Sequence, residues 1–307
     1  MSASADIGSS VDWAGSVALP GKQLPPHLQK AMSRVTEISS LPEITTKIVE
    51  VVEDPRATAQ DMHEIVKNDP ALATKILKVV NSAFYGLPAQ IASLNRAIIM
   101  LGLSAVKNIA LAASLARLFK ADAISSHFAA SDLWRHCIAV GVCARDLAAA
   151  ANNAQVDEYF VAGLVHDMGL LIEGQLFLDK FRAVAEACYG QPQNFCAAEI
   201  ATLGADHQCF GVALATRWKF PPALRYAVAY HHEPGALQLE FRRIATMIYV
   251  ADTICGKMQH GFYLTTQGQQ ITDEMLALID LDQAGMGAVC EQLPERIQEA
   301  ERILAEA

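Results

Sequence analysis

The sequence predicts an all-α protein. From Pro26 onward, apolar residues recur at the spacing of amphipathic helices, and no stretch shows the alternation of a half-buried strand. Hydrophobic residues make up 52% of the 307 residues and charged residues only 19%. This composition excludes extensive disorder and indicates a chain that buries most of its helical surface.

The first helices can be placed from their start and stop signals. Residues 1–24, rich in Ser, Ala and Gly, are predicted to be a mobile tail. An apolar stripe from Ile44 to Val52 predicts a helix that ends at Asp54-Pro55. Thr58 is expected to cap the next helix, and Asp69-Pro70 supplies the N-cap and first-turn proline of a third.

These short helices resemble a helix-turn-helix in outline, in which Lys67, Lys75 and Lys78 would be exposed and contact phosphates. The segment from Lys30 to Lys120 has a net charge of +3, whereas the rest of the chain has −12. This small basic excess favours the solvated face of an ordinary bundle. We therefore expect no specific DNA binding, and we expect two subdomains with different surfaces.

The cysteine pattern and the lack of a recognisable targeting signal predict the cellular compartment in which the protein resides. Seven cysteines without a C-x-x-C pair are typical of reduced thiols and exclude a zinc finger. No signal peptide and no membrane-spanning segment are predicted. We expect a cytoplasmic protein.

A second segment begins near Ser126, and the histidines gather there. Five of the nine histidines lie between His136 and His232, each in or at the end of an apolar helical stretch. His166-Asp167 lies in the apolar segment from Val161 to Ile172, which is predicted to be one buried helix. The small Gly163 in this segment would let a neighbouring helix approach closely.

The remaining histidines fall on separate predicted helices. Asp132 precedes His136 by one helical turn, and His207 begins a later helix. The pair His231-His232 ends the helix after that. Asp252 is embedded in the apolar run from Met247 to Ile254, where an ionised carboxylate needs a cationic partner.

Singly, each histidine is explained as a hydrogen-bonded core or helix-end residue. Together, imidazoles and carboxylates from several helices match the ligands of a divalent or ferric metal centre. We expect one or two ions of Fe, Mn, Zn or Ni. The sequence contains no G-x-S-x-G elbow and no G-x-x-x-x-G-K-[ST] phosphate-binding loop. Cys209 and His207 are two residues apart on a helix and point to different faces, so we expect no Cys-His nucleophile.

The chain from about Leu24 to Met258 also resembles the HDOD family, the HD-related output domains of bacterial signalling proteins. The resemblance is carried by Asp69-Pro70, Asn81-Ser82-Ala83-Phe84-Tyr85-Gly86, Ser93, Ala97-Ile98 and Leu101-Gly102. It implies a two-lobe helical bundle with an HD-type C-terminal lobe. We expect a lobe over residues 25–122, an HD-like lobe over 123–260 and a helical extension over 261–307.

The order of the histidines and aspartates resembles the HD metal-dependent phosphohydrolases, particularly their HD-GYP branch. This resemblance assigns one metal to His136, His166, Asp167 and Asp252. It assigns a second metal to His207, His231 and His232, with Asp167 as the bridge and catalytic residue. Asp132 matches an optional extra ligand. The pattern departs at Leu170, where the phosphate-contacting lysine is missing, and no Gly-Tyr-Pro loop follows the His-His pair.

These observations predict a signal-transduction output or scaffold protein with a retained metal centre. Its partner would be a signalling protein or a nucleotide. The alternative is an active metal-dependent phosphohydrolase, in which the metals activate a water molecule for attack on phosphorus.

Overall fold

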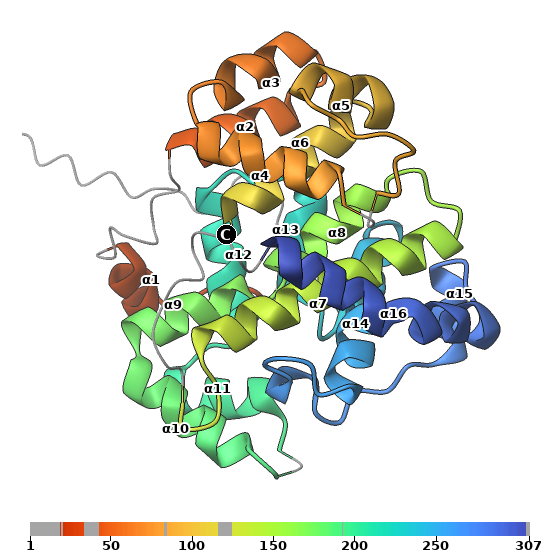
Figure 1. Ribbon diagram of the computed structural model, residues 1–307. Helices are drawn as coiled ribbons and strands as arrows, with labels where there is room; N and C mark the ends of the chain where they lie inside the picture. The colour runs from red at the N-terminus through yellow and green to blue at the C-terminus, as the bar shows by residue number, and fades with distance from the viewer. Residues whose placement is uncertain are drawn as a thin grey trace, which may run out of the picture.

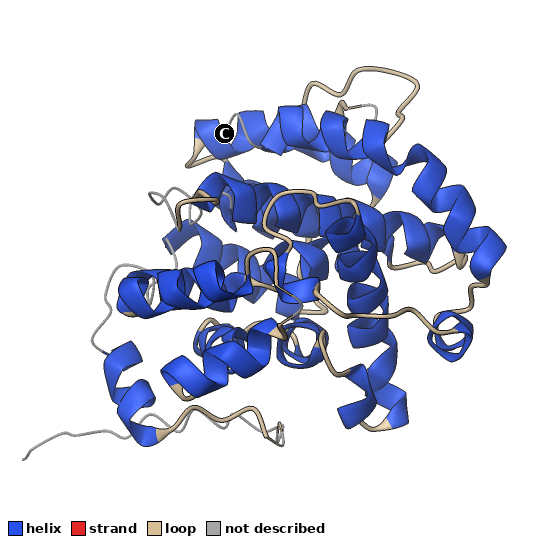
Figure 2. Cartoon of the chain, turned by 90° about the horizontal axis from the view of Figure 1, so that it is seen from below, coloured by secondary structure: helices blue, strands red, loops and turns tan. Residues whose placement is uncertain are grey.

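The fold is entirely helical in the residues that the structure describes. This computed structural model describes residues 19, 21–33, 43–82, 85–115, 125–191 and 193–304, and no strand occurs among them (Figure 2). The all-α prediction is confirmed. No helix within these residues has both the length and the apolar character needed to cross a membrane.

The helices follow one another along the chain with short connections. The N-terminal helices are α1 (Pro26–Ser33), α2 (Glu43–Glu53), α3 (Ala59–Val66), α4 (Pro70–Val80), α5 (Leu94–Leu101) and α6 (Leu103–Leu115). The central helices are α7 (Ala130–Ala150), α8 (Val156–Val165), α9 (Met168–Leu176), α10 (Leu178–Cys188), α11 (Phe195–Leu203), α12 (His207–Arg217), α13 (Pro222–Tyr230) and α14 (Leu239–Lys257). The 3-10 turns η2 (Pro234–Ala236) and η3 (Leu264–Thr266) flank α14, and α15 (Asp273–Leu278) and α16 (Gln283–Leu304) complete the chain.

Local capping fixes the first of these helices as predicted. Thr58 caps α3 in a reciprocal capping box with Asp61. Asp69 accepts a hydrogen bond from the backbone N–H of Leu72 and is followed by Pro70 in the first turn of α4. Both predicted helix starts are confirmed.

Helices α2 to α6 pack on one another and form the upper part of the molecule in Figure 1. In the lower part, α7 packs against α8, α14 and α16, and α12 packs against α9 and α13. The two parts meet where α6 crosses α8 and where α16 reaches α4. Most of the buried apolar residues form one cluster that extends from Leu24 to Leu304 through both parts, and a smaller second cluster lies around Tyr230.

Tyr85 ties the two parts together. Its hydroxyl donates a hydrogen bond of 2.9 Å to Asp157 at the start of α8, and the guanidinium of Arg145 lies 4.9 Å from its ring centre. Tyr85 therefore carries a contact from the turn at residues 81–86 to the second lobe. Phe84 lies outside the described residues.

Two expectations for the N-terminal half need correction. Lys75 is not exposed, because its side chain is buried and its ammonium donates to the carbonyl of Ala113 on α6. The predicted tail over residues 1–24 does not extend away from the helices over its last residues, since Lys22 and Leu24 are buried against them. Trp13 lies outside the described residues.

Two glycines let helices α7 and α8 approach each other closely. A Cβ on Gly163 of α8 would lie 2.5 Å from the Cα of Gly141 on α7, a distance that no packed structure tolerates. The crossing of α7 and α8 therefore depends on these two residues. It brings the end of α8, and with it His166, toward α7.

We expect Gly163→Ala to lower the free energy of unfolding by about 2 kcal/mol or more, because the backbones of α7 and α8 would have to separate. Urea unfolding followed by circular dichroism measures this loss. Gly174→Ala on α9 is the matched control, since its Cβ would meet only Phe181 ring atoms at 3.8 Å, and it should be neutral or stabilising by up to ~1 kcal/mol. Equal effects of the two substitutions would contradict the prediction.

Candidate metal centre

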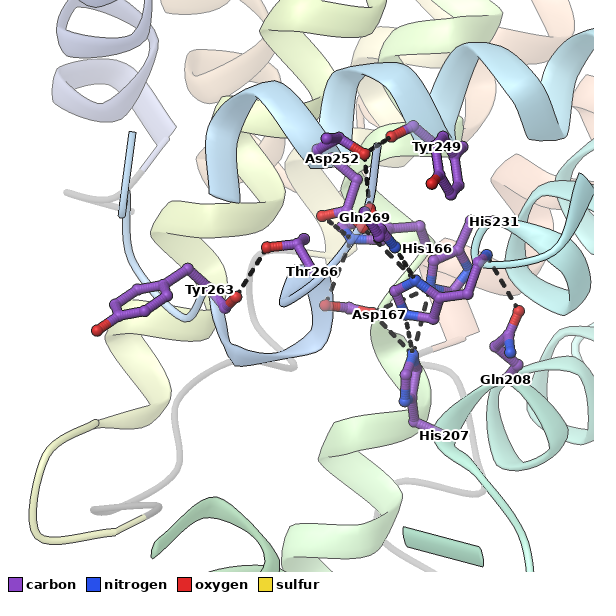
Figure 3. A network of polar contacts seen from close by, with 12 residues as sticks. His166, Asp167, His207, Gln208, His231, Tyr249, Asp252, Tyr263, Thr266 and Gln269 are labelled. Carbon is purple, nitrogen blue, oxygen red and sulfur yellow. Dashed lines mark hydrogen bonds and ion pairs between the residues drawn. The ribbon is translucent and has the colours of Figure 1, made fainter. Parts of the chain in front are cut away.

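Seven of the eight predicted ligands converge in the interior of the lower part of the molecule. Six of them have side chains with no solvent exposure, and that of His232 is 8% exposed. The converging residues are His136, His166, Asp167, His207, His231, His232 and Asp252. In Figure 3, Asp167 lies among His166, His207 and His231.

The His166-Asp167 pair lies in a break between helices, which corrects the prediction of one continuous helix. Helix α8 ends at Val165 and α9 begins at Met168. Adjacent residues of an uninterrupted helix diverge by about 100°. The break lets His166 Nε2 lie 3.3 Å from Asp167 Oδ2, so both side chains face the same point.

One group of ligands lies between α7, the α8–α9 break and α14. His136 Nε2 is 2.9 Å from Asp252 Oδ1, and His166 Nε2 is 3.6 Å from the same oxygen. Asp167 completes this group with His136 and His166. These are the four residues that the sequence assigns to the first ion.

The second group lies around the other oxygen of Asp167. His207 Nε2 and His231 Nε2 are each 3.3 Å from Asp167 Oδ1. His207 Nε2 is also 3.2 Å from His231 Nε2 and 3.0 Å from His232 Nε2. Asp167 thus faces one group with each of its oxygens, as a bridging carboxylate would.

Asp132 is the predicted ligand that the structure does not place in the cluster. Its carboxylate accepts a hydrogen bond of 2.7 Å from the backbone N–H of Ala129 and caps the start of α7. Its Oδ1 lies 3.9 Å from the guanidinium of Arg135. The one-turn spacing from His136 therefore reflects helix capping in this structure.

The outward nitrogens of four histidines are held by acceptors, which fixes the direction of the lone pairs. The Nδ1 atoms of His136, His166 and His231 face backbone carbonyl oxygens at 2.6 to 3.2 Å. His207 Nδ1 faces both carboxylate oxygens of Glu199 at 2.8 and 3.0 Å. Each Nδ1 therefore carries a proton, and in the neutral imidazole each Nε2 presents a lone pair to the cluster.

When all four rings are neutral, these lone pairs and the carboxylate oxygens face one another with no proton between them. His166 Nε2, both oxygens of Asp167 and Asp252 Oδ2 are buried and make no hydrogen bond within the described residues. Metal bonds of about 2.1 Å place neighbouring ligand atoms about 3.0–3.4 Å apart. The separations of 3.0 to 3.3 Å in the second group match this range, so the donor set fits a bound cation.

Burial and the charge–charge interactions between the histidines and the aspartates set the protonation states of the cluster. Burial lowers the pKa of His231 and His232, so both remain neutral near pH 7. Burial lowers the pKa of His166 as well, but Asp167 and Asp252 outweigh it and raise the value to about 10. Against the effect of burial, His166 and its neighbours hold the pKa of Asp167 well below its usual range. The two carboxylates are therefore ionised, and without a metal ion the imidazolium of His166 is a positive charge beside them.

Sequence reasoning missed the carboxylates behind His207. Glu199 on α11 is fully buried and accepts from both the Nδ1 and the backbone N–H of His207. Burial raises the pKa of both Glu173 and Glu199, and the hydrogen bond from Glu173 opposes this shift at Glu199. Glu173 therefore holds the proton of the pair, and Glu199 is the acceptor that faces His207. A carboxylate behind a histidine orients the ring and raises its basicity as a ligand. A glutamate eight residues before a histidine carries no sequence signal for this contact.

Sequence reasoning also missed Lys22. Its buried ammonium lies 3.5 Å from Asp206 Oδ2 and forms a short ion pair with Glu233. Asp206 immediately precedes His207, and Glu233 immediately follows His232. The segment before α1 is thus attached beside the second group of ligands.

Two residues beside the cluster, Leu170 and Cys209, argue against phosphate binding by a lysine and against a cysteine nucleophile. Leu170, at the position of the missing lysine, is buried in the core. Burial raises the pKa of Cys209 to about 12, which keeps this thiol protonated. A protonated Cys209 thiol is a poor nucleophile, which agrees with the expectation that Cys209 and His207 do not form a catalytic pair.

Comparisons with known proteins match this chain to the HDOD domain family and to solved structures with the same helical fold. The model of the HDOD domain family matches residues 38–234. A solved HDOD domain protein of unknown function from Geobacter sulfurreducens is 23% identical, with a TM-score of 0.77 over 90% of this chain and 96% of that one. A proposed phosphohydrolase of Shewanella amazonensis SB2B is 19% identical, with a TM-score of 0.71 over 91% and 98%. At these identities the two structures establish the likeness of the fold alone.

A curated relative from Treponema pallidum (strain Nichols), an uncharacterised protein, is 24% identical over 228 residues. The match covers 72% of this chain but only 43% of that protein. The chain therefore spans less than half the length of the curated relative that it matches.

We expect Lys22→Met to lower the free energy of unfolding by about 1–3 kcal/mol near pH 7, because Asp206 would stay buried without its partner. Burial raises the pKa of Asp206, but the Lys22 charge, together with His207 and the hydrogen bonds from Cys209, outweighs it and lowers the value from 3.8 to about 2. The stability from this pair is present above about pH 4 and is lost as the pH falls through 2. The difference between wild type and variant should therefore be smaller near pH 3 than near pH 7.

Urea unfolding at the two pH values measures this difference. Lys78→Met is the control, since Lys78 is exposed on α4, and it should change stability by less than about 0.5 kcal/mol. A Lys22 variant as stable as the control at both pH values would show that the ion pair contributes nothing.

Proposed function

Because the chain belongs to the HDOD domain family, we propose that it is a cytoplasmic signal-transduction output or scaffold protein that retains an HD-type metal centre. The centre holds one or two divalent or ferric ions, from among Fe, Mn, Zn and Ni. The helical body binds a signalling protein or a nucleotide. It does not bind DNA specifically.

One observation carries the metal centre. Four histidines have their Nδ1 protons committed to carbonyl or carboxylate acceptors, so each ring, once neutral, directs its Nε2 lone pair at oxygens of Asp167 and Asp252 at 2.9 to 3.6 Å. Without a metal ion, protonated His166 supplies positive charge beside these oxygens. Lone pairs facing anions in a buried site repel one another unless a cation lies between them. A metal ion satisfies every one of these atoms at once.

The two groups of residues would hold separate ions. His136, His166, Asp167 and Asp252 would bind the first ion, and Asp167, His207, His231 and His232 would bind the second. Ions bound there would activate a water molecule and polarise a phosphoryl group if a substrate reached them. The protein's part is to hold the imidazole rings, which the carbonyls behind His136, His166 and His231 and the Glu199 carboxylate behind His207 do.

The burial of the site favours a scaffold over an enzyme. Apart from His232, the ligand side chains have no exposure to solvent, so a phosphodiester has no direct contact with them in this conformation. The position of the phosphate-contacting lysine is taken by the buried Leu170. The alternative, an active phosphohydrolase, is favoured by the completeness of the two ligand groups.

We expect the purified protein to carry about one to two equivalents of metal per chain, because the buried carboxylates need that charge. Elemental analysis after aerobic and anaerobic preparation measures the content. Asp167→Ala should remove most of the metal. Asp132→Asn is the matched control, since it keeps the cap of α7 and lies outside the cluster, and it should retain the metal. Metal-free wild type under both preparations would contradict the proposal.

We expect metal binding and turnover to separate in this protein. Hydrolysis of bis-p-nitrophenyl phosphate, cyclic dinucleotides and nucleoside triphosphates should be negligible with the metal bound, because the site is closed and lacks the lysine. The Asp167→Ala variant should bind less metal and melt at a lower temperature than wild type, while its rate of hydrolysis stays as negligible as that of wild type. Metal-dependent turnover near about 1 per second, abolished by Asp167→Ala, would instead establish the phosphohydrolase.

A further inference from the structure

His232 differs from the other four histidines of the cluster in what lies behind its ring. The other Nδ1 atoms face carbonyl or carboxylate oxygens, which only accept. His232 Nδ1 faces the side-chain amide of Gln269, which lies 2.5 Å away in the loop after η3. An amide has a donor end and an acceptor end, so this contact can hold either tautomer of His232.

The other end of the same amide is also held. It lies 2.6 Å from the hydroxyl of Thr253, which is 1% exposed on α14. That hydroxyl also lies 2.7 Å from the carbonyl oxygen of Tyr249, one turn earlier. Figure 3 shows Gln269 between Tyr249, Asp252 and His231. A hydroxyl has one proton, so Thr253 donates to either the amide or the carbonyl, but not to both.

In the first of two arrangements, the amide nitrogen of Gln269 donates to His232 Nδ1 and Thr253 donates to the amide oxygen. The amide atoms have the orientation of this arrangement, with Nε2 toward His232 Nδ1 and Oε1 toward the Thr253 hydroxyl. The proton of His232 is then on Nε2, which lies 3.0 Å from the lone pair of His207 Nε2. His232 donates to His207 and has no lone pair for a cation.

In the second arrangement the amide is turned by half a revolution. Thr253 donates to the Tyr249 carbonyl and accepts from the amide nitrogen of Gln269, and the amide oxygen accepts from His232 Nδ1–H. His232 Nε2 then presents a lone pair to the cluster, as the other four histidines do. The number of protons is the same in both arrangements.

We propose that Gln269 is a positioning residue that selects the tautomer of His232. With no ion, it holds the Nε2–H form that satisfies His207; with an ion in the second group, its half-turn holds the Nδ1–H form that binds. The inference rests on the proposed metal centre, and it assigns to the loop after η3 the control of the second ion. Uptake of this ion then requires no loss of a proton from His232.

Two substitutions of Gln269 test the two arrangements separately, because each allows only one tautomer of His232. Gln269→Glu only accepts and holds the Nδ1–H form, so the second Zn²⁺ should bind at least as tightly as in wild type. Gln269→Lys only donates and holds the Nε2–H form, so the second Zn²⁺ should bind about 10- to 100-fold more weakly. The affinities are measured by titrating metal-free protein with Zn²⁺ against a chelator of known affinity.

The matched controls are Gln270→Glu and Gln270→Lys, which place the same charges on an exposed side chain of the same loop. Both should leave Zn²⁺ binding within about twofold of wild type. Equal affinities in the two Gln269 variants, or equal weakening in both, would overturn the proposal.

The tautomer itself is read from the nitrogen chemical shifts of His232 in labelled protein. We expect Nε2–H in metal-free wild type and Nδ1–H in metal-free Gln269→Glu. This readout separates selection of a tautomer from the plain effect of charge on a cation. It also decides the role of Gln269 if wild type binds no metal, an outcome that would refute the metal centre alone. The same tautomer in both proteins would overturn the proposal.

Discussion

Two ionised carboxylates in an apolar interior are the constraint on which this structure depends. Asp167 and Asp252 have no solvent exposure, and an unpaired buried carboxylate costs several kcal/mol. The break between α8 and α9 points Asp167 inward, and the contact of Gly141 with Gly163 brings α8 against α7. The carbonyls and the Glu199 carboxylate behind the imidazoles direct lone pairs at the same centre. Each feature prepares a site for positive charge.

The parts of this arrangement that depend on local sequence were predictable. Thr58 and Asp69 begin their helices through bonds to residues within three positions, and such bonds form whatever the rest of the chain does. The break at His166 was not predictable, because the flanking residues are apolar with helical spacing and only the packing of α8 and α9 ends the helix. Lys75 was predicted to be exposed for a similar reason, since nothing local indicates that α6 covers it.

The ligand set followed from order and residue type, but the groups behind the ligands did not. Lys22 and Asp206 are 184 residues apart, and Gln269 lies 37 residues from His232. No periodicity connects such pairs, because each contact exists only after the helices have packed. A lone glutamine or lysine is also a common surface residue. The structure was therefore needed to find the residues that orient the ligands, and to show that Asp132 caps a helix.

The burial that favours a cation at the proposed metal centre also limits the chemistry that an ion there could perform. Closing the cluster removes water from the carboxylates, which strengthens their attraction for a cation. The same closure keeps a phosphodiester away, and the buried Leu170 leaves no ammonium to hold a phosphate. An ion that binds only the folded state adds about 4 kcal/mol of stability at a thousandfold excess over its Kd. Selection for a stable helical body would thus be enough to retain these candidate ligands without catalysis, which is why the set alone does not distinguish a scaffold from an enzyme.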